Sequence, residues 1–287
     1  MTKPQANKSS ALAKQQDAGL PAGYDFDADA GAGLEGMSAD EQVVPFLRIL
    51  QANSPTVQES TVPGAKAGLI INTATSTLMP GFDFVIVHRD HKYIKRIPFD
   101  QGGGFLGILE PDNEEVLKLR QAQGQFGTLK CDDGESELAE TRYWYVFAKA
   151  HGLNAPAFRA MVPLASTQIG KYKAVMTKIN TELLYPGRTA GDPPRRPALW
   201  AHRWKATTRL EQNKKGKFFG WVFDLDTDPE RAAKAAENGW PMHSAALLAQ
   251  TDPLYIEAKA FYTTIQEGKA KVDYSKTADA AEGDAPF

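Results

Sequence analysis

The stretch FDFVIVHRDHKYIKR, residues 82–96, decides the fold because it predicts one long β-strand. Its first half is rich in β-branched and aromatic residues, and its second half continues with cations around Tyr93. Further strands are predicted at residues 157–164 and at residues 140–148, where the sequence ETRYWYVFA places aromatic rings on both faces. These strands follow one another without a regular alternation with helices, so a doubly wound parallel sheet is disfavoured.

A hairpin and several helices complete the predicted order. Residues 199–210 and 217–223 are strand-like runs joined by a polar tip, which is typical of a hairpin. Helices are predicted at residues 114–123, after a cap at Ser166 or Thr167, from Asp228 to Asn238, and from Asp252 to near Gly268. We therefore expect an α+β fold of mainly antiparallel strands, a barrel or sandwich with inserted and C-terminal helices.

Charge divides the chain into three parts. The net charge is −2, but residues 1–41 carry −4 and residues 277–287 carry −3, so the part between them is basic at +5. We expect residues 1–41 to be a disordered acidic arm, residues 42–268 to be the folded core, and residues 269–287 to be a flexible acidic tail. A basic core with acidic ends indicates an anionic ligand for which the ends can compete.

Composition narrows the function classes. No apolar run approaches the roughly 20 residues that cross a membrane, and no apolar signal segment follows Met1, so we expect a cytoplasmic protein without a membrane partner. A lone cysteine, Cys131, disfavours disulfide and structural zinc sites. No serine, cysteine or acid pair lies in a setting typical of a nucleophile or general base, so we expect neither an enzyme nor a cofactor.

The most basic stretch is residues 195–217, with eight cations against Glu211 alone. Strand alternation places Arg203, Lys205 and Arg209 on one face and apolar side chains on the other. Cations at strand spacing can follow a phosphate backbone, and exposed rings can stack on bases without reading their sequence. We expect Trp200 and Trp204 to be core residues, and an ordinary solvated hairpin explains this stretch equally well.

Two other segments, residues 88–96 and the helix after Thr167, repeat the combination of cations with aromatic rings. Together they predict a surface that binds single-stranded nucleic acid. The predicted contacts are Arg89, Lys92, Tyr93, Lys95, Arg96, Tyr143, Lys171, Lys173, Lys178, Arg195, Arg196, Arg203, Lys205, Arg209, Lys214, Lys215, Lys217 and Phe218.

The chain ends in a short acidic segment that finishes in Pro286-Phe287, a pattern suited to capture by an apolar pocket with a basic rim. This end resembles the acidic Pro-Phe tip of bacterial single-stranded DNA-binding proteins and the Phe-ended tails of their T7-like phage counterparts. The stretches VPFLRILQANSP, residues 44–55, and QGGGF, residues 101–105, are similar to those of a group of phage proteins. An ordinary frayed tail is the alternative.

The resemblance to phage single-stranded DNA-binding proteins implies an oligonucleotide/oligosaccharide-binding (OB) barrel. It also implies binding of single-stranded DNA without sequence preference during replication, recombination and repair. In that family the tail, here Asp284, Pro286 and Phe287, would recruit replication proteins (a polymerase, helicase or primase) and compete for the protein's own groove. The oligomeric state stays open, a homo-oligomer included.

Two other hypotheses remain. A metal-dependent nuclease or DNA-modifying enzyme would use Asp224 and Asp226 beside a basic groove. Asp228 nearby is better explained as a helix cap. A protein-only interaction factor acting on host replication would use the same basic surface for a protein partner.

Overall fold

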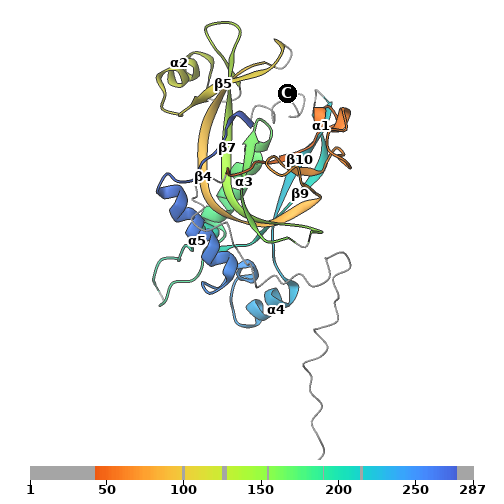
Figure 1. The fold of residues 1–287 in the computed structure, drawn as a ribbon. Helices are drawn as coiled ribbons and strands as arrows, with labels where there is room; N and C mark the ends of the chain where they lie inside the picture. The colour runs from red at the N-terminus through yellow and green to blue at the C-terminus, as the bar shows by residue number, and fades with distance from the viewer. Residues whose placement is uncertain are drawn as a thin grey trace, which may run out of the picture. The chain divides into compact units, whose positions relative to one another are not determined.

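The structure is a computed structural model that describes residues 43–98, 101–124, 128–153, 155–189, 191–213 and 216–276 (Figure 1). The strands are β1 (Leu47–Ile49), β2 (Ile70–Asn72), β3 (Leu78–Met79), β4 (Gly81–Ile97), β5 (Gly104–Leu109), β6 (Thr128–Lys130), β7 (Glu137–Ala150), β8 (Phe158–Ala165), β9 (Trp204–Asn213) and β10 (Gly216–Leu225). The helices are α1 (Pro55–Gln58), α2 (Glu114–Gln123), α3 (Gln168–Thr181), α4 (Pro229–Glu237) and α5 (Pro253–Gln266), with 3-10 turns η4 (Leu199–Ala201) and η5 (Met242–Ala246). The fold is α+β, and these strands all pair antiparallel.

The long strand predicted at residues 82–96 is confirmed as β4, which organises the larger sheet. β4 pairs with β7 along almost its whole length, from Phe82 opposite Ala150 to Arg96 opposite Glu137. Its other edge pairs with β9 at its beginning and with β5 at its end. The seven-stranded sheet has the order β10-β9-β4-β7-β6, with β5 on β4 and β8 on β7, and a second sheet has the order β1-β2-β3.

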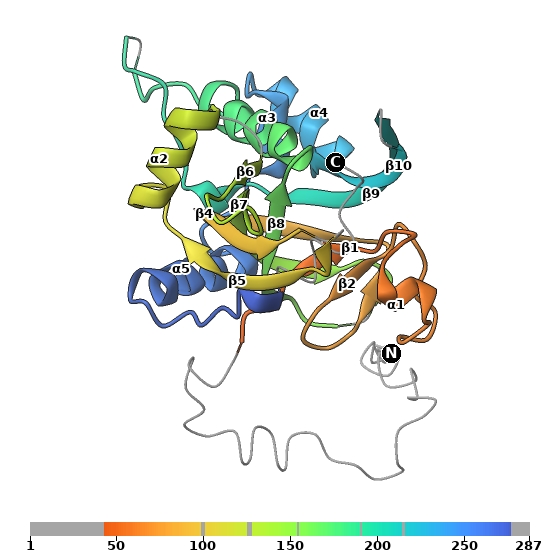
Figure 2. The ribbon, with the colours of Figure 1, turned by 90° about the horizontal axis from the view of Figure 1, so that it is seen from above.

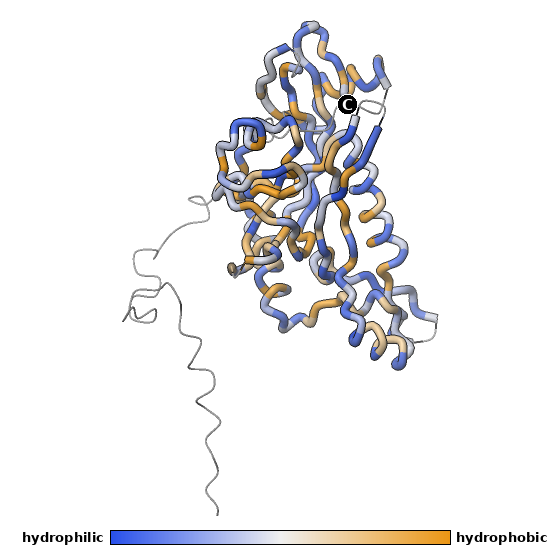
Figure 3. The backbone as a smooth tube through the Cα atoms, turned by 90° about the vertical axis from the view of Figure 1, so that its right-hand side faces the viewer, coloured by the Kyte–Doolittle hydropathy of each residue, from blue (hydrophilic) through white to orange (hydrophobic). Residues whose placement is uncertain are grey.

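Both faces of the central strands are buried. Trp144 and Val146 of β7 enter one core, which α3 covers with Tyr172 and Val175. Tyr145, on the opposite face of β7, enters a second core that includes Ala258 and Phe261 of α5. Figure 2 shows α3 and α5 on opposite sides of β4 and β7, and Figure 3 shows hydrophobic and hydrophilic residues alternating along the chain. The aromatic rings on both faces of β7 therefore build the interior.

Side-chain amides bond the edge of β10, one from the segment after β1 and one from the first residue of α3. Phe46 forms a bridge with Met161 on β8, which joins the segment leading into β1 to the large sheet. At the other end of this segment, the Gln51 amide donates to the Phe219 carbonyl and accepts from the Phe219 N–H, both at 2.8 Å. Gln168 Oε1 accepts from the backbone N–H of Trp221 at 3.0 Å. The described strand pairings leave both sheets open, and these amides satisfy the edge of β10.

The helix predictions hold in most of their detail. α2 occupies the predicted residues, and Asp228 and Asp252 cap α4 and α5 through their side-chain oxygens. The predicted cap of α3 is wrong, because Thr167 has a helical backbone and its side chain makes no capping hydrogen bond.

Two predicted boundaries need correction. The strand expected from residue 199 begins only at Trp204, because the backbone before it pairs elsewhere: Leu248 N–H donates to the Ala201 carbonyl, and His202 forms a bridge with Leu247. The tail expected from residue 269 is part of the fold up to residue 276, since Tyr274 packs in the α5 core.

Candidate nucleic-acid interface

The basic stripe predicted on β9 exists, but carboxylates neutralise it. Lys205 and Arg209 are exposed on one face of β9, as the alternation predicts, and Arg203 immediately precedes the strand. Lys205 Nζ lies 2.7 Å and Arg203 Nη1 3.7 Å from the carboxylate of Asp226, and Arg209 Nη2 lies 3.6 Å from Glu211. The Asp226 pairs tie β9 to the end of β10, whereas Arg209 and Glu211 both lie on β9, and these carboxylates offset part of the positive charge of the stripe.

The cations of β4 and α3 are paired in the same way. The nitrogen-to-oxygen distances are 2.6 Å from Lys92 to Glu110, 2.7 Å from Lys95 to Glu115, and 2.8 Å from Arg96 to Glu137. Lys171 on α3 contacts Glu211. The hydrogen bond from Lys95 to Glu115 raises the pKa of that ammonium, because the pair favours the charged lysine. These paired cations therefore stabilise the fold, and less of their charge remains for a ligand.

The three aromatic rings predicted to stack on bases are buried, and this part of the prediction is wrong. Tyr93 is 1% exposed, Tyr143 0% and Phe218 5%. Tyr93 and Tyr143 lie between β4, β7 and the helices that cover them. A buried ring presents no face to a base, so stacking must come from other aromatic residues.

The remaining predicted contacts divide into two groups. Arg89 is exposed on β4, Lys173 and Lys178 lie on α3, and Lys217 is exposed near the tip of the β9–β10 hairpin. Lys214 and Lys215, with the tail residues Asp284, Pro286 and Phe287, lie outside the described residues.

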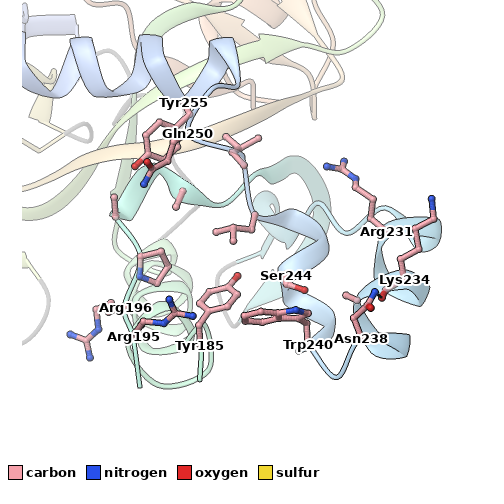
Figure 4. Close-up of a pocket in the computed structure, with 16 residues that line it drawn as sticks. Tyr185, Arg195, Arg196, Arg231, Lys234, Asn238, Trp240, Ser244, Gln250 and Tyr255 are labelled. Atoms are coloured by element: carbon pink, nitrogen blue, oxygen red, sulfur yellow. Dashed lines mark hydrogen bonds between the residues drawn. The ribbon is translucent and has the colours of Figure 1, made fainter. Parts of the chain in front are cut away.

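Two of the predicted arginines, Arg195 and Arg196, line a pocket of about 600 Å³ that we call the basic pocket (Figure 4). They lie on one side, and Arg231 and Lys234 of α4 lie on the other, with Trp240 between them. No Asp or Glu is among the described residues that line this pocket, and no described carboxylate forms an ion pair with Arg231 or Lys234.

Local structure fixes the cations of the basic pocket in place. The backbones of Tyr185 and Arg195 exchange two hydrogen bonds, and Arg195 Nε donates to the Pro186 carbonyl at 2.8 Å. On α4 the Asp228 cap starts the helix, so that Arg231 and Lys234, three residues apart, share one face. A carbonyl partner orients a guanidinium without cancelling its charge.

A buried hydrogen bond positions the floor of the pocket. The Tyr185 hydroxyl lies 2.8 Å from Nε2 of His202, and His243 packs edge-on against the Tyr185 ring. Burial, with a smaller contribution from His243, lowers the pKa of His202 to about 4, and burial raises the pKa of Tyr185 to about 12. At neutral pH the imidazole is therefore uncharged, and its hydrogen bond with the hydroxyl group orients the Tyr185 ring.

A second pocket of about 600 Å³, the Arg89 pocket, is lined by Arg89, Arg142, Trp200 and Tyr262 together with Asp90 and Glu110. Trp200 contacts Tyr262 with ring centroids 4.9 Å apart, and it contacts Tyr255, which lines the basic pocket, at 6.2 Å. We call Trp200, Tyr255 and Tyr262 the aromatic ladder. Its half-buried rings join the linings of both pockets.

The residues that complete this surface could not be picked out from the sequence. Arg231 and Lys234 were hidden in a helix of balanced charge, and Tyr255 and Tyr262, two turns apart on α5, look like an ordinary core stripe. Trp200, expected in the core, is half-buried and packs against the core that includes Phe261 of α5.

One of the two acids named in the nuclease hypothesis is engaged in ion pairs. Asp226 is held by Lys205 and Arg203. Across the part of the chain that the structure describes, no group of three His, Cys, Asp or Glu side chains is placed to hold a metal ion. In the same ranges, no helix combines the length and the apolar character that crossing a membrane requires.

Comparison with known proteins gives one match. A family model described as Pam3 phage gp34-like protein matches residues 13–271. None of the curated proteins and none of the solved structures matches the chain significantly. The matched range includes both pockets and the aromatic ladder and stops before the acidic end of the chain.

Proposed function

The chain belongs to the Pam3 phage gp34-like protein family, and from this premise we propose that it is a phage protein that binds single-stranded DNA without sequence preference. Its role would lie in replication, recombination or repair of phage DNA in the cytoplasm of the bacterial host. The observation that carries the proposal is the aromatic ladder, which places half-buried rings between two pockets that contain cations.

The chemistry of this surface fits an unpaired strand. Arg195, Arg196, Arg231 and Lys234 at one end and Arg89 at the other supply charge for phosphates. The rings between them are half-buried, and base stacking on an aromatic ring contributes about 1–3 kcal/mol per base. A duplex hides its base faces, so it would use the cations alone.

We also propose that the two sheets form a relative of the OB barrel, in which side-chain amides take the place of strand pairing along one edge. The support is the segment between Phe46 and Gln51, which bridges to β8 at one end and bonds the edge of β10 at the other. The aromatic ladder and the two pockets would then form a binding surface away from the edge of β10 that the amides bond.

For the acidic end we propose the two roles that the family resemblance implies: recruitment of a replication protein through Asp284, Pro286 and Phe287, and competition for the basic surface. The family match ends at residue 271, so these roles rest on this chain's own sequence. Removing residues 277–287 is expected to tighten DNA binding at low salt because three carboxylates leave.

The deciding experiment is titration of oligo-dT at low salt, followed by tryptophan fluorescence, with competition by duplex DNA of the same length. We expect quenching by oligo-dT and weak competition by duplex. Trp200→Ala is expected to weaken binding, measured with labelled oligo-dT because the substitution removes a tryptophan, and Lys118→Gln with Lys130→Gln, on the exposed α2 side, serves as a control away from the proposed surface. Absence of binding to oligo-dT at low salt would refute the proposal.

A further inference from the structure

We propose that the basic pocket is a nucleotide site, which takes one nucleotide unit that carries a terminal phosphate. Such a unit is either a free nucleotide or the phosphorylated end of a strand. The proposal builds on the proposed function, because the second source is the end of a strand bound along the aromatic ladder.

The charge of the pocket exceeds what an internal phosphodiester needs. Arg195 and Arg196 on one side and Arg231 and Lys234 on the other are among the residues that line it, without an acidic side chain among the described lining (Figure 4). A phosphodiester carries one negative charge, whereas a terminal phosphate carries about −1.5 to −2 at neutral pH. Arginine also binds phosphate oxygens through two parallel N–H bonds. A terminal phosphate therefore gains more from a lining that contains these cations than a phosphodiester does.

The size and polar groups of the pocket suit a base and sugar as well. Its volume of about 600 Å³ lies within the range of small-molecule sites, about 300–1,000 Å³. Trp240 is 43% exposed and supplies a flat face. The Asn238 side chain donates its N–H to the Lys234 carbonyl at 2.7 Å, while its oxygen has no hydrogen-bond partner among the described residues. That oxygen and the amide of Gln250 can bond to base edges.

The Arg89 pocket has the same volume but a different charge. Its lining includes Asp90 and Glu110 beside its cations, so a doubly charged phosphate would meet two carboxylates there. The structure therefore places the terminal phosphate in the basic pocket and leaves the Arg89 pocket to internal nucleotides.

The test measures binding of thymidine, dTMP and dTTP to the full chain by calorimetry and by tryptophan fluorescence. We expect affinity to rise with the number of phosphates. Arg231→Gln with Lys234→Gln should weaken dTTP binding about tenfold or more, and Lys118→Gln with Lys130→Gln should leave it unchanged. Equal binding of thymidine and dTTP, or dTTP binding that ignores the first double variant, would overturn the proposal.

A second set of titrations separates the sources of the unit and the two proposals. Oligo-dT with a phosphate at the 5′ end, at the 3′ end or at neither is titrated into the same variants. A gain of several-fold from one terminal phosphate, abolished in the double variant at Arg231 and Lys234, indicates a strand end. Binding of dTTP without such a gain indicates a free nucleotide. If oligo-dT binds equally with and without phosphate and dTTP fails to bind, the nucleotide site is refuted and the proposed function stands. If dTTP binds and oligo-dT does not, the proposed function is refuted and the nucleotide site stands.

Discussion

The salt dependence of oligo-dT binding distinguishes the basic pocket from the β9 stripe. The double variant Arg195→Gln, Arg196→Gln removes two charges whose resolved partners are backbone carbonyls. For single strands the slope of log K against log salt becomes shallower by about 0.7 for each phosphate that the protein no longer neutralises, so the slope should decrease by about 1.4. Between 50 and 200 mM salt this difference amounts to about sevenfold in relative affinity.

The assay is titration of oligo-dT at several salt concentrations, with the stripe variant Lys205→Gln, Arg209→Gln as the control. The control removes the same formal charge, but Lys205 and Arg209 have Asp226 and Glu211 as partners, so its slope should change less than that of the pocket variant. A larger change in the stripe variant than in the pocket variant would refute this reasoning and return the interface to β9.

Three further predictions concern stability, each measured by urea unfolding. His202 has a pKa of about 4 in the folded chain and 6.5 in the unfolded chain, so between these pH values only the unfolded chain binds the proton. The contribution of His202 to the free energy of unfolding is therefore complete above about pH 6.5 and falls by on the order of 3 kcal/mol towards pH 4. His202→Gln should remove this part of the pH dependence, and an unchanged pH dependence would contradict the reasoning. Gln51→Ala leaves the half-buried N–H and carbonyl of Phe219 unpaired and should cost about 2 kcal/mol with faster amide exchange at Phe219, whereas unaltered exchange would speak against this contact between Gln51 and β10. Phe84→Ala empties a fully buried site between Phe82 and Trp144 and should cost about 3–5 kcal/mol; a decrease below 1 kcal/mol would mean that this core is not as tightly packed as described.

Local signals in the sequence were sufficient for most elements. The β-branched run of β4 and the aromatic alternation of β7 reflect side chains on two buried faces, and that periodicity is written in consecutive residues. The starts of α4 and α5 are predicted by the pairs Asp228-Pro229 and Asp252-Pro253, because the cap and the proline act within one turn of the helix.

Distant partners could not be predicted from such signals. Lys92 meets Glu110 and Arg96 meets Glu137 because β5 and β7 return beside β4 in one particular register. The sequence shows the cations of residues 88–96 but not the acids that will lie opposite them. The η4 turn also depends on residues far away in the sequence, since its backbone pairs with residues near Leu248.

The same limit explains why residues 195–217 divide into two halves with different roles. A count along the chain gives one dense block of positive charge. In the fold, Arg203, Lys205 and Arg209 meet carboxylates, so their charge is used in holding the sheet. Arg195 and Arg196 meet carbonyls, which orient a guanidinium and leave its charge intact. The chemistry of each partner, not the density of cations, therefore decides which half of the block can bind an anion.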